Sequence, residues 1–111
     1  MSEVSQLERQ REGSLALIAE RDLALKLSDN PDFKKLILEE FCVRECARYA
    51  QSSGDPALTA EQRADALALS QAAGHLRRWL SVKVRMGNQA EGQLPELEAA
   101  IEEARQEGGE E

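Results

Sequence analysis

The sequence predicts an all-α fold, and its composition carries that prediction. The chain contains 16 Ala, 15 Leu and 16 Glu, whereas Val, Ile and Thr together number only eight. Alanine and straight-chain residues favour helices, while β-branched residues suit pleated sheets. A chain of 111 residues is one domain by length. We therefore expect a small helical hairpin or a three- to four-helix bundle with an acidic C-terminal helix or tail.

Charge is distributed unevenly along the chain. Residues 91–111 carry eight carboxylates against one base, Arg105, and this segment accounts for the whole net charge of -7. Charge asymmetry of this kind is typical of a protein that contacts a partner. The sequence predicts three parts: a polar N-terminal segment at 1–13, a helical core domain at 14–90 and an acidic helix or tail at 91–111.

The first strong helical pattern runs from Ser14 to Ser28, after a glycine at position 13 that we expect to weaken or interrupt the helix. Apolar residues recur at helical spacing and cover more than one stripe of its surface. One face is formed by Leu15, Ala16, Ala19, Leu23 and Leu27, and further apolar residues lie well around the helix from it.

The second helix has the best-defined start in the chain. Asn30 is a favoured N-cap residue and Pro31 suits the first helical position, so the helix should begin at Pro31. It should run to about Gln51, before the turn-forming residues 52–56. Three apolar stripes surround it, which predicts more than one partner helix. The stripes are Phe33, Ile37 and Phe41; Leu36, Val43, Ala47 and Ala50; and Leu38, Cys42, Cys46 and Tyr49.

A capping-box pattern, Thr59 followed by Gln62, starts the third helix at Ala60. We expect this helix to end at Met86, because Gly-Asn at 87–88 is typical of a helix C-terminus. Its core stripe is Ala66, Leu69, Ala73, Leu76, Leu80 and Val84, with Trp79 beside it as a core side chain.

A fourth helix should begin near Pro95 and end before the two glycines at 108–109. Its apolar seam is narrow and lies among glutamates, so it should dock weakly. The seam consists of Leu94, Leu97 and Ile101.

No constellation in the sequence predicts catalysis or a bound metal. Cys42 and Cys46 lie four residues apart on one side of a helix, but His75 is the only histidine and no second Cys or His pair completes a site. We interpret both cysteines as buried thiols and His75 as a solvent-facing or hydrogen-bonded side chain. Nucleophile motifs and phosphate-binding loops are absent from the sequence. We expect neither enzyme activity nor a cofactor.

Residues 67–89 contain no acid and include four bases, Arg77, Arg78, Lys83 and Arg85. These bases could contact phosphates, or they could receive glutamates of the fourth helix within one subunit or between subunits. The overall acidity favours acid–base pairing over nucleic acid. No apolar run is long enough for a membrane span, and the N-terminus lacks a secretion signal, so we expect a protein made and kept in the cytosol.

One segment resembles small, mostly uncharacterised helical proteins encoded by tailed bacteriophages. The resemblance rests on the Asn-Pro-Asp-Phe-Lys-Lys-Leu-Ile-Leu-Glu run at 30–39, on Phe41, Glu45 and 47–48, and on the later stretches 72–76 and 86–87. It covers residues 14–90. The resemblance implies a virion or virion-assembly component, such as a head, head-to-tail or internal protein, present in many copies and lacking catalysis. Such a protein is made in the host cytoplasm and resides in the virion.

The sequence thus predicts a structural protein that binds itself or other phage structural proteins, because its apolar stripes exceed what a few helices can cover. The alternative is a phage-encoded adaptor or inhibitor of a host protein, with the acidic end as a nucleic-acid mimic. The expected interaction residues are Phe33, Ile37, Phe41, Leu76, Trp79 and Leu80, with Arg77, Arg78, Lys83 and Arg85 as an electropositive surface.

Overall fold

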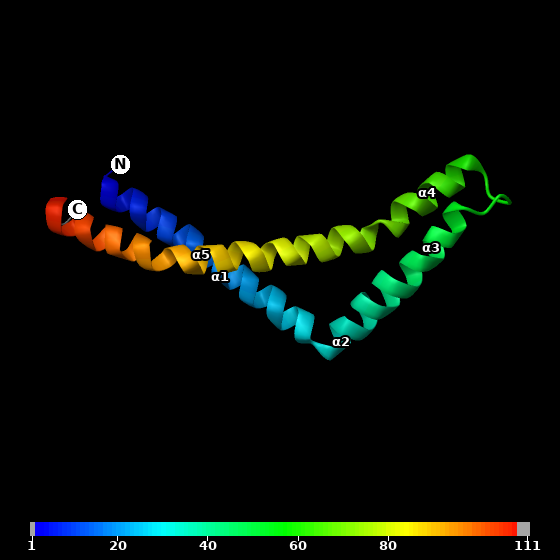
Figure 1. Ribbon diagram of the computed structural model, residues 1–111, viewed down its shortest axis with the longest axis horizontal. Helices are drawn as coiled ribbons and strands as arrows, with labels where there is room; N and C mark the ends of the chain where they lie inside the picture. Colours follow the sequence, from blue (N-terminus) through cyan, green and yellow to red (C-terminus); the bar gives the residue numbers. More distant parts are fainter. Residues whose placement is uncertain (1, 109–111) are drawn as a thin grey trace. The chain divides into compact units, whose positions relative to one another are not determined.

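The computed structural model describes residues 2–108, and it confirms the all-α prediction because none of these residues lies in a strand. The helices follow one another in the order drawn in Figure 1. They are α1 (Glu3–Asp29), α2 (Pro31–Phe33), the π-helix η1 (Lys34–Glu45), α3 (Cys46–Ser53), α4 (Ala60–Ser70) and α5 (Ala72–Gly108).

The chain forms two compact units. Unit 1 comprises Met1–Leu25 together with Val82–Glu111, and unit 2 comprises Lys26–Ser81. The divisions expected after residues 13 and 90 both fall within helices of unit 1. Residues 109–111 of the predicted acidic segment lie outside the described residues.

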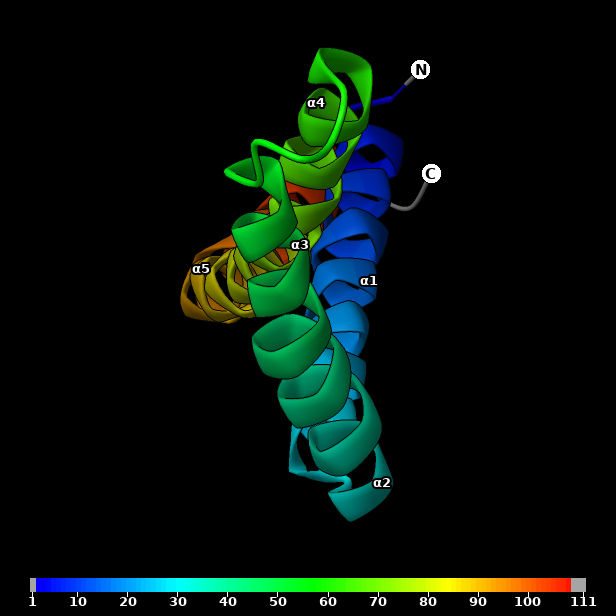
Figure 2. The same ribbon diagram turned by 90° about the vertical axis from the view of Figure 1, so that its right-hand side faces the viewer.

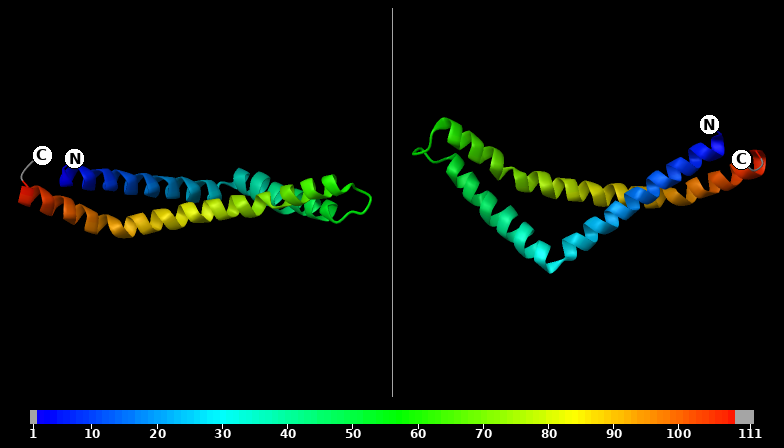
Figure 3. Two further views of the ribbon diagram at one scale, coloured as in Figure 1. Left: turned by 90° about the horizontal axis from the view of Figure 1, so that it is seen from above. Right: turned by 180° about the vertical axis from the view of Figure 1, so that it is seen from behind.

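Unit 1 is an antiparallel pair of helices, α1 up to Leu25 and α5 from Val82 onward. The start of α1 and the end of α5 lie at the same end of the pair (Figures 1 and 3). Most of the buried residues are small, which lets the two backbones approach closely. The buried residues of this unit are Val4, Ala24, Gly87, Ala90, Ile101 and Ala104. Ile101 belongs to the predicted apolar seam, whose other members, Leu94 and Leu97, are half-buried.

α1 continues through Gly13, so the glycine does not interrupt the helix. Glycine in a helix interior costs about 1 kcal/mol relative to alanine, which packing can offset. Val4 is buried before the glycine, and Glu8 forms an ion pair with Arg105 of α5. These contacts hold the turns that precede Gly13 against the second helix.

α5 also continues beyond the predicted end at Met86, so the expected separate helix from Pro95 is wrong. The residues that resemble a helix terminator instead face α1. Gly87 is buried against the side chain of Arg21, and the Asn88 side chain accepts a hydrogen bond from Arg21 at 3.0 Å. Pro95 lies inside the helix, so one backbone hydrogen bond of α5 is missing there.

The continuity of α5 also overturns the expected fold-back of the acidic segment onto the basic side chains of the same chain. At a rise of 1.5 Å per residue, Arg85 and Glu96 lie about 16 Å apart along one helix axis. Within the chain, Glu91 pairs instead with Arg21 of α1. Pairing of these glutamates with basic side chains of a second subunit stays a prediction.

Unit 2 contains a helical hairpin in which α3 and α4 pack side by side (Figures 1 and 2). Both predicted caps are confirmed. The Asn30 side chain accepts hydrogen bonds from the N–H groups of Asp32 and Phe33, and Thr59 and Gln62 form a reciprocal capping box. The buried side chains of this unit are Cys42, Cys46 and Ala66.

The predicted helix from Pro31 to about Gln51 is present and extends to Ser53, but residues 34–45 are π-helical. The Cys46 N–H reaches the carbonyl of Phe41, five residues earlier. The same wide turn explains an ion pair between Lys35 and Glu40 at 3.1 Å. Residues five apart diverge by about 140° on an α-helix, whereas the i→i+5 repeat of a π-helix brings them together.

The predicted third helix is divided at Gln71. The Ser70 hydroxyl donates to the carbonyl of Leu67 at 2.7 Å, and the Gln71 N–H bonds to Ala68, only three residues back. Serine hydroxyls that bond to preceding carbonyls compete with the helical ladder and bend helices. α4 therefore ends at Ser70, and α5 begins at Ala72.

Candidate protein-binding surfaces

The predicted apolar interaction residues all lie in unit 2, and none of them is fully buried. Phe33, Ile37, Phe41, Leu76 and Leu80 are half-buried, whereas Trp79 is 58% exposed. The interpretation of Trp79 as a core side chain is therefore wrong. The buried residues of unit 2 belong to η1, α3 and α4, and none lies in the described stretch 72–81 that carries the tryptophan.

Other large apolar side chains of unit 2 are also exposed. Leu36 is 65% exposed and Val43 is 57% exposed on η1, and about half of each of Leu67 and Leu69 is accessible on α4. Leu38 and Phe41, which share η1 with them, are half-buried. Clusters of exposed apolar side chains mark surfaces that bind other proteins more often than scattered single residues do.

The four predicted basic residues are divided between the two units. Arg77 and Arg78 are exposed in unit 2, while Lys83 and Arg85 belong to unit 1. Lys83 donates to Glu20 of α1 at 2.8 Å. One of the four predicted basic residues is thus used within the chain.

Arg21 is the centre of a polar cluster that the sequence did not reveal. Its side chain is 14% exposed, and it donates to Asn88 at 3.0 Å, to Glu91 and to the neighbouring Asp22 at 3.1 Å. The Glu91 carboxylate, followed by that of Asp22, raises the pKa of the Arg21 guanidinium. Because the partners on α5 lie 67 and 70 residues away, no local pattern marks them. The cluster fixes which turn of α1 faces which turn of α5.

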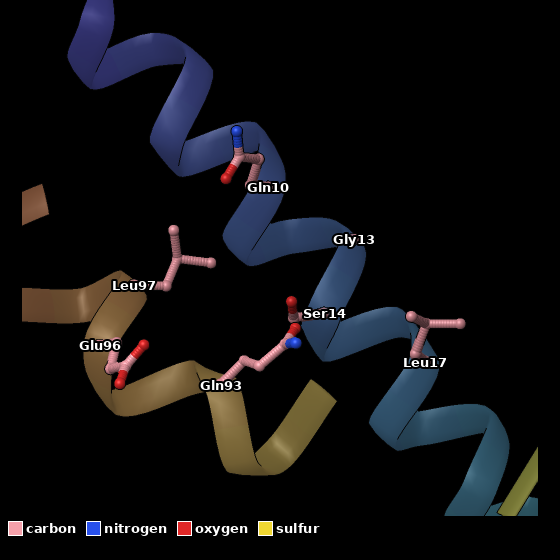
Figure 4. Close-up of a pocket in the computed structure, with 7 residues that line it drawn as sticks. All are labelled: Gln10, Gly13, Ser14, Leu17, Gln93, Glu96 and Leu97. Carbon is pink, nitrogen blue, oxygen red and sulfur yellow. The ribbon is translucent and has the colours of Figure 1, made fainter. Parts of the chain in front are cut away.

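A shallow groove runs along one side of the helix pair in unit 1 (Figure 4). Leu17 and Leu97 supply its apolar surface, and Gly13 leaves open space because a side chain there would meet no other atom within 4 Å. The remaining lining residues are Gln10, Ser14, Gln93 and Glu96. This mixture of apolar, polar and charged side chains is suited to contact with the side chains of another protein.

η1 and α3 carry several ion pairs between their own side chains. Hydrogen bonding from Lys35, aided by the charge of Arg44, lowers the pKa of the Glu40 carboxyl. Hydrogen bonding from Arg48 lowers the pKa of Glu45 in the same way. The Glu45 carboxylate in turn raises the pKa of the Tyr49 phenol.

The reactive side chains lie in ordinary surroundings. Cys42 and Cys46 are free and buried, which confirms their interpretation as core thiols, and His75 is exposed on α5 as expected. Within residues 2–108, no three His, Cys, Asp or Glu side chains are grouped so that they could hold a metal ion.

Across the same residues, no helix combines the length and apolar character that crossing a membrane requires. Comparison of the chain with protein-family models, curated proteins and solved structures gives no significant match.

Proposed function

We propose that the protein is a non-catalytic structural component that acts through helix-mediated contacts with other proteins. The observation that carries this proposal is the exposure of Leu36, Val43 and Trp79 on unit 2. Leaving large apolar side chains in water forgoes about 1.5–3 kcal/mol for each one that a partner could bury. A helical hairpin with this surface gains stability when another helix covers it.

The resemblance of residues 14–90 to small helical proteins of tailed phages supports a more specific version. In that version the protein is a head, head-to-tail or internal component of a virion, made in the host cytoplasm. Its partners are its own copies and other phage structural proteins. Mass spectrometry of purified particles should then find several or many copies per particle, and absence of the protein from particles would contradict this version.

Paired substitutions test whether the exposed surface is the binding surface. Leu36→Ser combined with Trp79→Ser should reduce incorporation into particles, because it removes the two most exposed large apolar side chains of unit 2. His75→Ser is the matched control, since His75 is exposed one turn before Trp79 on α5. Trp79 is the single tryptophan of the chain, so its fluorescence should shift to shorter wavelength when a partner covers it. Unchanged emission in the assembled protein would contradict this assignment.

Exposed carboxylates favour a second candidate function, an adaptor or inhibitor that binds a host protein as a nucleic-acid mimic. The exposed acidic side chains of α5 after Pro95 are Glu96, Glu98, Glu102, Glu103 and Glu107. Deletion of the segment would not be a clean test, because Ile101 and Ala104 are buried in unit 1. Replacement of the five glutamates by glutamine keeps the helix. It should abolish binding by a mimic and leave assembly of a structural subunit intact.

A further inference from the structure

The groove of unit 1 can accommodate a large apolar side chain from outside the chain. Gly13 leaves space in its wall, because a Cβ atom there would meet no other atom within 4 Å. Figure 4 shows Leu97 extending from α5 into the space beside α1. The groove has a volume of about 600 Å³, which is room for more than one large side chain. Its apolar surface, supplied by Leu17 and Leu97, would be covered by such a side chain.

The side of unit 1 that carries the groove is acidic. Glu96 lines the groove, and Glu103 follows it by seven residues on the same side of α5. On α1, Glu3 precedes the lining residue Gln10 by seven residues and shares its side of that helix. The three glutamates are exposed, and within residues 2–108 none of them forms an ion pair. Unit 1 as a whole contains thirteen acids and six bases. A partner that enters the groove should therefore carry positive charge.

Unit 2 presents a surface of the complementary kind. Trp79 is 58% exposed, and it directly follows Arg77 and Arg78 on α5. Both arginines are exposed, and neither forms an ion pair with another of the described residues. Successive residues of an α-helix diverge by about 100°, so Arg78 lies beside the indole ring and not behind it. Tryptophan and arginine are enriched among the residues that contribute most to binding in protein interfaces.

We propose that the groove of unit 1 receives Trp79 from unit 2 of a second copy, with Arg78 of that copy beside Glu96. The indole then packs against Leu17 and Leu97, and the guanidinium lies at the acidic rim. Complementary charge selects a second copy as the occupant, because every copy carries both the acidic groove and the basic tryptophan surface. The inference rests on the proposed function, since it names one partner and one contact of a protein that acts through helix-mediated contacts.

This contact joins two different surfaces and is therefore heterologous. After two copies have associated, one copy still has an open groove and the other still has an exposed tryptophan surface. Further copies can be added at both ends, and the result is a ring if the rotation closes or a filament if it does not. Such growth suits a component that is present in many copies.

Filling the groove tests the receiving side. Gly13→Gln should raise the dissociation constant for self-association roughly tenfold or more, because the new side chain occupies the space that Trp79 needs. It should preserve α1, since glutamine is a better helix former than glycine. The matched control is Gly92→Gln on α5, where a Cβ atom also meets nothing within 4 Å but the residue does not line the groove. Sedimentation equilibrium of the full chain should find the control within about twofold of the unchanged protein. Equal association of the two variants overturns the proposal.

Fluorescence of the single tryptophan follows the entering side directly. Emission of the unchanged chain should shift to shorter wavelength as its concentration rises, because the indole of Trp79 leaves water. Gly13→Gln should show no shift over the same range of concentration. A chain that stays monomeric, or an emission wavelength that does not depend on concentration, overturns the proposal.

A mixture of two variants tests whether the contact is heterologous. Trp79→Ser keeps the groove and should raise the dissociation constant about thirtyfold or more, as expected for a central tryptophan. Gly13→Gln keeps Trp79 but has a filled groove. At a concentration where neither variant associates alone, an equimolar mixture should form a heterodimer and grow no further. A mixture that stays monomeric overturns the proposal, and a contact between two identical surfaces would give that result.

Charge exchange tests the contact between Arg78 and Glu96. Arg78→Glu alone and Glu96→Arg alone should each weaken self-association several-fold, because each places like charges together. The double variant again pairs opposite charges between copies and should recover most of the lost affinity. A double variant as weak as the two single changes combined overturns the pairing of these two residues.

Failure of this inference and failure of the proposed function give different results. Particle incorporation that survives Gly13→Gln but is lost with Leu36→Ser and Trp79→Ser overturns the groove contact and supports the proposed function. Self-association through the groove by a protein that is absent from particles supports the inference and overturns the virion role.

Discussion

Gly87 of α5 lies directly against the side chain of Arg21 of α1. A Cβ atom at position 87 would come closer than 3.0 Å to the β, γ and δ carbons of Arg21, a distance that real side chains do not adopt. The arginine then extends past the glycine to Asn88 and Glu91 on the next turn of α5. Glycine at this position therefore allows both the close approach of the helices and the polar cluster beyond it.

Gly87→Ala should destabilise unit 1, although alanine is the better helix former. The added methyl group meets the stem of Arg21, which is too close to its own backbone to move aside easily, and overpacking of this kind costs about 1–3 kcal/mol. Gly92→Ala is the matched control on the same helix, because a side chain there meets no atom within 4 Å. It should stabilise the helix by up to about 1 kcal/mol.

Urea denaturation followed by circular dichroism measures both variants. We expect Gly87→Ala to lie about 2 kcal/mol or more below Gly92→Ala in free energy of unfolding. Equal stabilisation by the two alanines would show that α1 and α5 do not approach as closely as described.

This contact also shows why the sequence predicted some helix ends correctly and others incorrectly. The caps at Asn30 and Thr59 are local devices in which a side chain bonds to a backbone N–H two or three residues away. Their signals are complete within a few residues of sequence. Gly87 and Asn88 have the composition of a helix terminator, but their role is decided by Arg21, 66 and 67 residues earlier. A contact over that separation leaves no local pattern.

The exposed apolar residues of the candidate binding surface could also be predicted only in part from the sequence. The apolar stripes of residues 31–51 indicated more apolar surface than one hairpin covers, and Leu36 and Val43 are exposed. Which stripe lies inward depends on the π-helical stretch 34–45, because its wider turn changes the face that each residue occupies. An analysis based on the α-helical period cannot anticipate that change.

The single tyrosine provides a direct measurement of the η1–α3 contacts. Hydrogen bonding to the Glu45 carboxylate, with the negative charge of that group, raises the pKa of Tyr49 above its ordinary 10.0. A raised folded-state pKa stabilises the fold below pH 10, and this contribution is lost as the pH rises through the folded value. Absorbance of the phenolate should therefore titrate above pH 10, and Glu45→Gln should return it toward 10. A titration that is unchanged by Glu45→Gln would contradict the contact.

The ion pair between Lys35 and Glu40 should make η1 sensitive to acid. Lys35 lowers the pKa of Glu40 below 4.5, so its stabilising contribution is present above the unfolded value and is lost as the pH falls through the folded one. Glu40→Gln should lower stability at neutral pH and make no difference once the carboxyl is protonated. The control is Glu39→Gln, because Glu39 is 3.9 Å from the same lysine at an ordinary i+4 spacing. A larger effect of Glu39→Gln would show that η1 lacks the π-helical turn.

The two thiols should report the packing of α3 against α4. Cys46 is 4% exposed, with its sulfur 3.9 Å from the Leu69 carbonyl of α4, and Cys42 is also buried. A water-soluble disulfide reagent should therefore react slowly with the native protein, at a rate set by opening of the hairpin, and rapidly in denaturant. Ala47→Cys is the matched control, because residue 47 is exposed on the same helix and a thiol there should react at once. If the native cysteines reacted as fast as Cys at position 47, the hairpin would not pack α3 on α4.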